Sequence, residues 1–336
     1  MSLHLHGLGH FHPENEITNE FLEDLDIGTN DEWILERVGI RSRRTTLALD
    51  YIRTTRNEDP RGAAEASLYS HADTGRRAAE MAIERAGIDK SDVGMVLAGS
   101  SVMDTATPAE SCNVARALEI EAPSLDVNSA CTSFFANLYL LSLMHPSKLP
   151  EFILVVCPEA VTRSVHYRDR ASAVLWGDAA AAAVVSTKVP GRAEILHNTF
   201  ESNPAGAEKV VVPRVGHFRQ DGRAVQAFAI KKTTHMVGEL RGEFESDGRL
   251  IHFVGHQANL RMLEAVCRFA GVPGDLHHSN VEWFGNTAAA GAPSVVSQRW
   301  LSWSSTDDIA LVGVGAGLSW SGCLLRFRVS EGAVSC

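Results

Sequence analysis

The first half of the chain alternates between strand-like and helix-like patterns of apolar residues. Over 74–86 the apolar positions recur at helical spacing, and Gly87 then supplies a residue type that closes many helices. Thr107, followed by Pro108 and Glu110, predicts another helix start, with Thr107 as the capping residue. Continuous apolar runs predict buried strands over 93–98, 125–127, 152–157 and 180–185.

The second half repeats this order of elements. Helical patterns cover 225–244 and 259–270, and Gly271 ends the second of them. Strand-like runs lie at 194–200, 250–255, 309–314 and 318–327. Strands that alternate with helices predict an α/β fold with a mainly parallel or mixed sheet and helices packed against it. The shared order suggests an internal duplication, although no repeat is visible residue by residue, and divides the chain into halves at 1–187 and 188–336.

Two segments near the N-terminus do not follow this alternation. Residues 30–40 indicate a short capped helical turn that runs into a loop. Residues 45–73 are polar and irregular, and the stretch 53–61 is strongly charged. We therefore expect an exposed excursion of the chain over 45–73.

Composition and charge exclude several classes of protein. The 336 residues carry a net charge of −10 with a pI of about 5.8, which argues against wholesale binding to nucleic acid or to an anionic membrane. No apolar run reaches the length of a transmembrane helix, and the N-terminus lacks the regions of a signal peptide. We therefore expect a cytoplasmic globular protein.

Cysteine and histidine spacing gives no sign of a metal centre. The six cysteines are widely separated and form no CxxC pair, so we expect reduced thiols. Four histidines lie close to the N-terminus, at His4, His6, His10 and His12. Acidic or cysteine partners at ligand spacing are missing there, so we expect a half-buried or solvated first strand and no metal site.

Cys131 lies where an apolar strand gives way, through small polar residues, to a long apolar helix that ends near Met144. The free N–H groups and partial positive charge at a helix N-terminus favour a thiolate and lower the pKa of a cysteine. Cys131 is therefore a candidate nucleophile that would accept an acyl group. On this stretch alone, a buried structural thiol is an equally good interpretation.

Two later motifs place polar side chains at predicted strand ends or turns. His256 follows a buried strand and precedes a helix, and Asn286 stands in a Gly-Asn turn before a run of small residues. Reactive groups of α/β proteins usually lie where strands end. Taken singly, His256 is equally compatible with a core histidine, and Asn286 with a simple turn residue.

Taken together with Cys131, these motifs resemble a known enzyme family. GHQANLRML around His256, GNTAAAGAP around Asn286 and GAGLSW from Gly315 resemble the signatures of β-ketoacyl-acyl-carrier-protein synthase III in the thiolase superfamily. The resemblance extends from DEWI at 31–34 to LLRF at 324–327. It implies a thiolase-like α/β fold in which two duplicated halves form αβαβα layers. It also implies a homodimer that binds no cofactor, uses CoA or phosphopantetheine thioesters and has acyl carrier protein as its partner, with acyl-CoA as an alternative donor.

The resemblance implies a role for each residue of the site. Cys131 would take an acyl group from a thioester, and the backbone N–H groups of Cys131 and Ala316 would hold the tetrahedral oxyanion. His256 and Asn286 would donate hydrogen bonds to the second thioester, which stabilises the enolate formed by loss of carbon dioxide. The enolate carbon would then attack the acyl-cysteine, which is Claisen chemistry.

The resemblance also implies which residues line the tunnel through which substrates reach Cys131 and which residues contact the carrier protein. Trp33 and Arg37 match a tryptophan that stacks on adenine and a nearby arginine, and Arg163 matches a second arginine that contacts CoA. Arg261 and Arg268 lie seven residues apart on one face of a predicted helix, where they would contact an acidic carrier protein. For each arginine, an ordinary solvated surface charge is the alternative interpretation.

Three departures from the family pattern point away from the housekeeping reaction. Arg223 follows Gly222 where the family commonly has asparagine. The polar excursion at 45–73 is longer than the corresponding segment of the housekeeping enzymes. Arg223 thereby adds a positive charge near the predicted tunnel. Thr107 stands where the housekeeping enzyme has a bulky aromatic residue that closes the acyl pocket of the partner subunit. Loss of that ring frees on the order of 100 Å3, so we expect acyl chains longer than acetyl.

We therefore interpret the chain as a ketosynthase of polyketide or antibiotic biosynthesis that joins two long or β-ketoacyl chains, as in α-pyrone formation. His256 would then act as a base on the acidic α-carbon of a β-keto thioester. One alternative is decarboxylative condensation of acyl-CoA with malonyl-carrier protein in fatty-acid initiation, and another is acyl transfer to oxygen or nitrogen. Outside the enzymes that transfer acyl groups, the alternatives are a catalytically silent scaffold partner and a thiol-redox protein.

Overall fold

Nine strands form one continuous sheet in residues 2–245 and 248–328, the part of the chain that this computed structural model describes. They are β1 (Leu3–Phe11), β4 (Val93–Ala98), β5 (Ser124–Asp126), β6 (Phe152–Glu159), β7 (Ala179–Ser186), β8 (Ala193–Ser202), β11 (Leu250–Gly255), β12 (Asp307–Gly315) and β13 (Ser319–Phe327). Their order is β11-β12-β13-β8-β1-β7-β6-β4-β5. β1 pairs with β7 on one side and with β8 on the other, so it joins the two halves of the chain.

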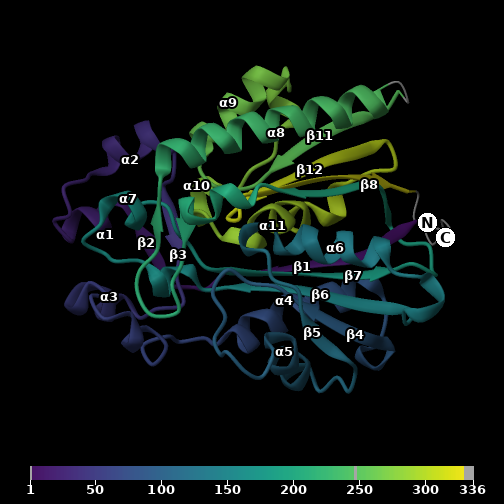
Figure 1. The fold of residues 1–336 in the computed structure, drawn as a ribbon, viewed down its shortest axis with the longest axis horizontal. Helices are drawn as coiled ribbons and strands as arrows, with labels where there is room; N and C mark the ends of the chain where they lie inside the picture. Colours follow the sequence, from purple (N-terminus) through teal and green to yellow (C-terminus); the bar gives the residue numbers. More distant parts are fainter. Residues whose placement is uncertain (1, 246–247, 329–336) are drawn as a thin grey trace.

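Helices form three layers around these strands. The helices are α1 (Asn19–Asp24), α2 (Asp31–Arg37), α3 (Leu49–Thr55), α4 (His71–Ala86), α5 (Glu110–Leu118), α6 (Ser133–Leu143), α7 (Arg170–Ala173), α8 (Gly222–Phe244), α9 (Leu260–Ala270), α10 (Val281–Phe284) and α11 (Gly291–Gln298). α4 and α5 cover one outer face, and α8 and α9 cover the other. Helices α6 and α11 are buried between two groups of strands, β1 and β4–β7 on one side and β8 and β11–β13 on the other (Figure 1). The predicted α/β class and αβαβα layering are confirmed.

Short elements connect the layers. The small strands are β2 (Glu16–Thr18), β3 (Ser42–Arg44), β9 (Val210–Val211) and β10 (Arg219–Gln220). The 3-10 helices are η1 (Pro60–Ala63), η2 (Lys90–Asp92), η3 (Ala130–Thr132), η4 (Pro146–Lys148), η5 (Val161–Ser164), η6 (Pro204–Lys209), η8 (Gly274–Leu276), η9 (Ala288–Ala290) and η10 (Trp300–Ser302). The elements α1, α2, α3, α7 and the β2–β3 pair gather at one end of the molecule (Figure 1).

The central helix α6 is mainly apolar and is buried over most of its length, although Leu143 at its end is 64% exposed. Phe134, Phe135, Leu138 and Leu141 are each at most 2% exposed. They share one core with strands of both halves of the chain. A helix with so few polar residues is stabilised by burial on more than one side, which explains its place in the middle layer. Cys131 lies just before its first turn.

Most predicted elements are confirmed, but one predicted helix start is wrong. Gly87 and Gly271 close α4 and α9 with φ of +67° and +62°. α5 begins at Glu110, after Ala109, and Thr107 lies outside the helix as an exposed residue. The Asp126 carboxylate accepts the first helical N–H groups, from residues 110 and 111, at 2.8 and 2.9 Å. The cap therefore comes from the end of β5 and not from the chain just before the helix.

The prediction of an exposed excursion over 45–73 is wrong in part. Seven of these residues form α3, and Leu47, Ile52 and Ala63 are each at most 1% exposed. These three side chains pack in the core cluster that also holds Cys131. They are too far apart in sequence to show a helical period, so only the tertiary contacts reveal that the segment is packed.

The N-terminal histidines and the cysteines have ordinary structural surroundings. The predicted first strand is β1, in which His10 Nδ1 hydrogen-bonds to Ser297 Oγ at 2.8 Å. His12 stacks on Phe284 with ring centroids 3.8 Å apart. The five cysteines among the described residues are free thiols, and Cys336 lies outside those residues. In the same described ranges, no helix combines the length and apolarity needed to cross a bilayer.

Gly9 in β1 lies so close to α4 that a methyl group has no room. A Cβ at this position would lie 1.9 Å from the Ala78 carbonyl oxygen and 2.7 Å from the Ala82 nitrogen. Both are backbone atoms, so the strand or the helix would have to shift. We expect Gly9→Ala to lower the free energy of unfolding by about 3 kcal/mol, measured by urea denaturation.

Gly242→Ala is the matched control for this substitution. Gly242 is an exposed residue of α8, and a Cβ there would meet no atom within 4 Å. Alanine is the better helix former, so we expect a gain of about 0.5–1 kcal/mol. Equal stability of Gly9→Ala and the wild type would contradict the close approach of β1 and α4.

Candidate active site

Cys131, His256 and Asn286 line one cavity of about 590 Å3. Cys131 lies in η3 at the start of α6, His256 follows the end of β11, and Asn286 lies between α10 and η9. The three residues come from both halves of the chain. The structure therefore brings together the side chains that the sequence predicted, while their catalytic roles remain predictions.

The turn around Cys131 is tightly held. Ala130 has φ of +47°, in the left-handed region that most residues avoid. Thr132 Oγ1 and Ser319 Oγ are 2.7 Å apart, which joins the turn to the start of β13. A Cβ on Gly315 would lie only 3.2 Å from the Cβ of Cys131. The Gly315-Ala316-Gly317 turn therefore approaches the cysteine closely.

The pKa of Cys131 contradicts the expectation from the helix N-terminus. The thiol is buried, with 8% of the residue exposed. Burial and the nearby Glu159 carboxylate raise its pKa to about 12, although the Ser101 hydroxyl and the N–H groups of Cys131 and Ala316 favour the thiolate. The expectation of a lowered pKa was wrong because it considered the helix end and not the loss of water around the sulfur. The same two N–H groups are the predicted oxyanion donors, and that role stays a prediction.

His256 is neutral in its buried position. It is 6% exposed, and burial lowers its pKa to about 4. Next to it, the Gln257 side chain holds the turn, because Nε2 donates to the Gly255 carbonyl at 2.6 Å and Oε1 accepts from the Asn280 N–H at 3.0 Å. His256 therefore offers an uncharged N–H donor in a rigid loop.

Asn286 has its amide oriented by the local backbone. Its Oδ1 accepts from the Ala288 N–H at 3.0 Å, and its own N–H donates to the Leu175 carbonyl at 2.8 Å. Within the described part of the chain, no hydrogen bond is recorded for Nδ2. Asn286 therefore presents a second uncharged donor to the cavity, beside His256.

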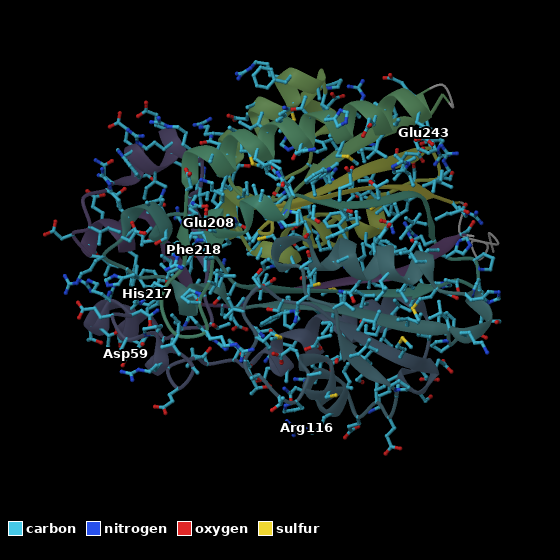
Figure 2. All side chains as sticks on the ribbon, in the orientation of Figure 1. Asp59, Arg116, Glu208, His217, Phe218 and Glu243 are labelled. Atoms are coloured by element: carbon cyan, nitrogen blue, oxygen red, sulfur yellow. The ribbon has the colours of Figure 1, made fainter. Side chains whose placement is uncertain are left out.

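Trp33 and Arg37 of α2 lie at the same cavity as Cys131. The Arg37 guanidinium lies 4.8 Å from the Trp33 ring centroid, and Arg170 lies over the same ring at the same distance. The first turn of α8 forms another wall through Gly222 and Val225. Figure 2 shows Phe218 near this end of α8 and Glu243 at its far end.

The structure places Arg163 outside this cavity. Its guanidinium pairs with Asp104 and donates to the Tyr69 carbonyl at 2.6 Å. Arg163 lies instead at a second cavity of about 600 Å3. Two partners thus hold the Arg163 side chain away from the cavity of Cys131, and its predicted contact with CoA stays a prediction. Arg223 is exposed on α8 and lies beside the tunnel wall without forming it.

The second cavity lies on the other side of the Cys131 turn. Asn128 and Ala130 line it, together with Ser101. Thr107 is exposed and does not line the second cavity, although its neighbours Thr105 and Ala106 do. The predicted effect of this threonine on a partner subunit stays a prediction.

The two predicted carrier-protein contacts lie on the surface. Arg261 donates to the Leu35 carbonyl at 2.8 Å and to Glu264 at 2.9 Å, so it ties α9 to α2. Arg268 is exposed and lies over the Phe269 ring at 5.1 Å. Both are available for contact, and Arg261 also has a structural partner.

Sequence reasoning missed three residues beside Cys131. Trp176 and Phe218 pack edge to face with centroids 4.7 Å apart, in the same core cluster as the cysteine. Glu159 is fully buried at the end of β6. A carboxylate directly after an apolar strand was the available signal for Glu159, whereas nothing in the sequence singles out the aromatic pair.

Comparisons with known proteins agree with this geometry. A family profile described as 3-oxoacyl-[acyl-carrier-protein (ACP)] synthase III matches residues 125–204, and the profile of its C-terminal region matches residues 247–327. The chain is 32% identical to the β-ketoacyl-[acyl-carrier-protein] synthase III of Oceanobacillus iheyensis. That similarity covers 97% of this chain and 99% of the relative.

Solved structures show the same fold. The 3-oxoacyl-(acyl carrier protein) synthase III of Pseudomonas aeruginosa PAO1 matches with a TM-score of 0.83 and 27% identity, over 98% of this chain and 99% of that one. The priming β-ketosynthase of the R1128 polyketide pathway matches with a TM-score of 0.78 and 27% identity, over 97% and 96%. The chain therefore belongs to the β-ketoacyl-[acyl-carrier-protein] synthase III family, whose members are acyltransferases that form carbon–carbon bonds.

Proposed function

We propose that the enzyme holds an acyl group on Cys131 and condenses it with a second thioester bound to acyl carrier protein. The two chains are long or β-ketoacyl chains, and the product belongs to polyketide or antibiotic biosynthesis of the α-pyrone type. The observation that carries this proposal is the single cavity shared by Cys131, His256 and Asn286, with Trp33 at the same cavity.

The first half-reaction transfers the acyl group. The Cys131 sulfur forms a bond to the thioester carbonyl carbon, and the carrier or CoA thiol leaves. The N–H groups of Cys131 and Ala316, which favour the thiolate form of this sulfur, would receive the negative oxygen of the tetrahedral intermediate.

The second half-reaction needs an enolate or an equivalent carbanion. A neutral His256 and the Asn286 amide supply two N–H donors without adding charge to the buried site. Such donors stabilise the enolate oxygen of the second thioester, which forms when the proton of its acidic α-carbon passes to the unprotonated nitrogen of His256. The enolate carbon then bonds to the acyl carbonyl carbon, and the bond from that carbon to the Cys131 sulfur breaks. Simple acyl transfer to oxygen or nitrogen has no enolate, so this pair of donors favours carbon–carbon bond formation.

The specialised branch would need room for a long chain beyond the cavity that Cys131 lines. The second cavity of about 600 Å3 borders the Cys131 turn at Asn128 and Ala130. The R1128 priming β-ketosynthase also shows that polyketide enzymes are found among the relatives of this fold. The alternative is decarboxylative condensation of acyl-CoA with malonyl-carrier protein in fatty-acid initiation, the reaction class suggested by the name of the Oceanobacillus relative.

The proposal includes a homodimer in the cytoplasm that docks an acidic carrier protein. Strand β5 forms one edge of the sheet, and its Leu125 is 42% exposed. An exposed strand edge with an apolar residue is suited to pairing with a second copy. The exposed Arg261 and Arg268 on α9 supply positive charge for the carrier protein.

Intact-mass spectrometry tests the acyl-enzyme directly. With acyl thioesters of increasing chain length, we expect the protein to gain one acyl mass, which is lost in Cys131→Ala. Cys112→Ala is the control, because this exposed thiol lies outside the catalytic cavity. An adduct that persists in Cys131→Ala, or no adduct with any donor, would overturn the proposal. Loss of carbon dioxide on joining would favour the fatty-acid alternative.

His256→Ala and Asn286→Ala separate the two half-reactions. Each removes one enolate donor, so we expect condensation to slow about 10²–10³-fold while the acyl adduct on Cys131 still forms. Product formation and adduct formation are followed in the same reaction by mass spectrometry. Condensation at the wild-type rate in both variants would show that these donors have no part in the second step.

Thr107→Phe tests the predicted acyl-length preference. A ring at this position should close the acyl pocket across the dimer, so we expect the rate with a decanoyl donor to fall at least about tenfold relative to acetyl. Ser147→Phe is the control, since that exposed residue lines neither of the two cavities. An unchanged ratio of decanoyl to acetyl rates in Thr107→Phe would refute the assignment.

A further inference from the structure

A buried carboxyl group holds the segment that follows Asn286. Glu159 is 0% exposed at the end of β6. Its Oε1 accepts from the Ala289 N–H of η9 at 3.2 Å. The same carboxylate accepts from the Ser101 N–H at 3.0 Å, and from the hydroxyls of Ser101 and Ser100 at 3.1 and 3.2 Å. Glu159 therefore joins η9 to the loop that follows β4.

A carboxylate suits this position better than an amide does. The N–H groups of Ser101 and Ala289 and the two serine hydroxyls converge on its oxygens. An ionised carboxylate accepts at both oxygens and donates at neither, whereas a glutamine would place an NH2 group against at least one of these donors. Burial raises the pKa of Glu159 to about 7, while the hydrogen bonds from Ser101 and Ala289 favour its charged form.

The start of η9 has a backbone conformation that needs support. Ala288 has φ of +47°, in the left-handed region that residues with a side chain rarely adopt. Such a conformation persists only where the surrounding structure fixes it. The hydrogen bond from Ala289, the next residue, to Glu159 is one fixed point, and the bond from the Ala290 N–H to the Thr287 carbonyl at 3.1 Å is another.

The same residue, Ala288, orients the Asn286 amide. The Ala288 N–H donates to Asn286 Oδ1 at 3.0 Å. Half a turn of this amide would exchange its oxygen and its nitrogen, and would present an acceptor to the substrate oxygen in place of a donor. The bond from Ala288 opposes that rotation. Contacts therefore run in sequence from Glu159 through Ala289 and Ala288 to the Asn286 side chain.

The geometry points to Glu159 as a positioning residue for the Asn286 amide. By binding the Ala289 N–H, it holds the left-handed turn at Ala288, and the Ala288 N–H then keeps Asn286 Nδ2 available as a donor. Glu159 does not line the catalytic cavity, so it acts through Asn286 and touches no reacting atom. The inference rests on the proposed role of Asn286 in the second half-reaction, and it explains how a side chain on a loop keeps one orientation.

Amide hydrogen exchange tests the hold on η9 without any substrate. Exchange is followed by mass spectrometry of peptides from the whole protein, labelled at about pH 8, where the Glu159 carboxyl is ionised. In Glu159→Gln we expect peptides that cover 286–290 to exchange at least about fivefold faster than in the wild type. Glu159→Asp, which keeps the charge but is one methylene shorter, should loosen the same peptides.

Glu110→Gln is the matched control for the exchange experiment. Glu110 is a carboxyl of α5 that is 2% exposed and accepts from the Asp104 N–H at 3.0 Å. Among the described residues, no hydrogen bond is recorded between it and η9. This variant should leave the exchange of 286–290 unchanged.

A double-mutant cycle tests the consequence for the reaction. Glu159→Gln should slow condensation about tenfold without slowing the formation of the acyl adduct on Cys131, because Asn286 acts only in the second half-reaction. In an Asn286→Ala background, the same substitution should change the condensation rate less than about twofold, since the amide that Glu159 positions is gone. Both rates are measured by mass spectrometry in the same reaction.

Several results would overturn the inference. Unchanged exchange over 286–290, or faster exchange confined to 99–104, would show that Glu159 holds only the loop after β4. Faster exchange throughout the chain would show a general loss of structure. Equal slowing by Glu159→Gln in the wild-type and Asn286→Ala backgrounds would show that Glu159 acts independently of Asn286. Condensation at the wild-type rate in Asn286→Ala would instead contradict the proposed function, while the exchange over 286–290 still decides whether Glu159 holds η9.

Discussion

Burial of α6 between the two groups of strands is the constraint on which the site depends. The helix is mainly apolar, and strands of both halves share one core with it. Its N-terminal end then has a fixed position where the two halves meet. Cys131 occupies that end, and the loops with His256 and Asn286 reach the same cavity from the second half. The catalytic arrangement is therefore a consequence of how the core is packed.

The same burial decides the charge state of the reactive groups. Loss of water raises the pKa of the Cys131 thiol and lowers that of the His256 imidazole, so both groups are held in their neutral forms. Neutral donors suit the stabilisation of an enolate, because their dipoles are already oriented when the charge appears. A neutral thiol is a poor nucleophile, however, so the site needs a route for its proton.

The sequence was a good guide wherever local pattern decides the structure. Helix stops at Gly87 and Gly271, the strand 250–255 and the junction at Cys131 follow from periodicity and from residue type. Contacts between distant segments were not visible. Asp104 holds Arg163 across 59 residues, and Glu159 reaches Ala289 across 130. The pKa of Cys131 was misjudged for the same reason, since burial is a property of the whole fold.

The position of β1 has a consequence for how substrates arrive. Because this strand pairs with β7 and with β8, one unbroken hydrogen-bonded sheet spans both halves of the molecule. A hinge between the halves would have to break that ladder, so the enzyme does not open and close around its substrates as many two-domain enzymes do. Delivery must instead rely on a thin, flexible arm threaded past Trp33. The pantetheine arm of the thioesters that we propose as substrates has that shape.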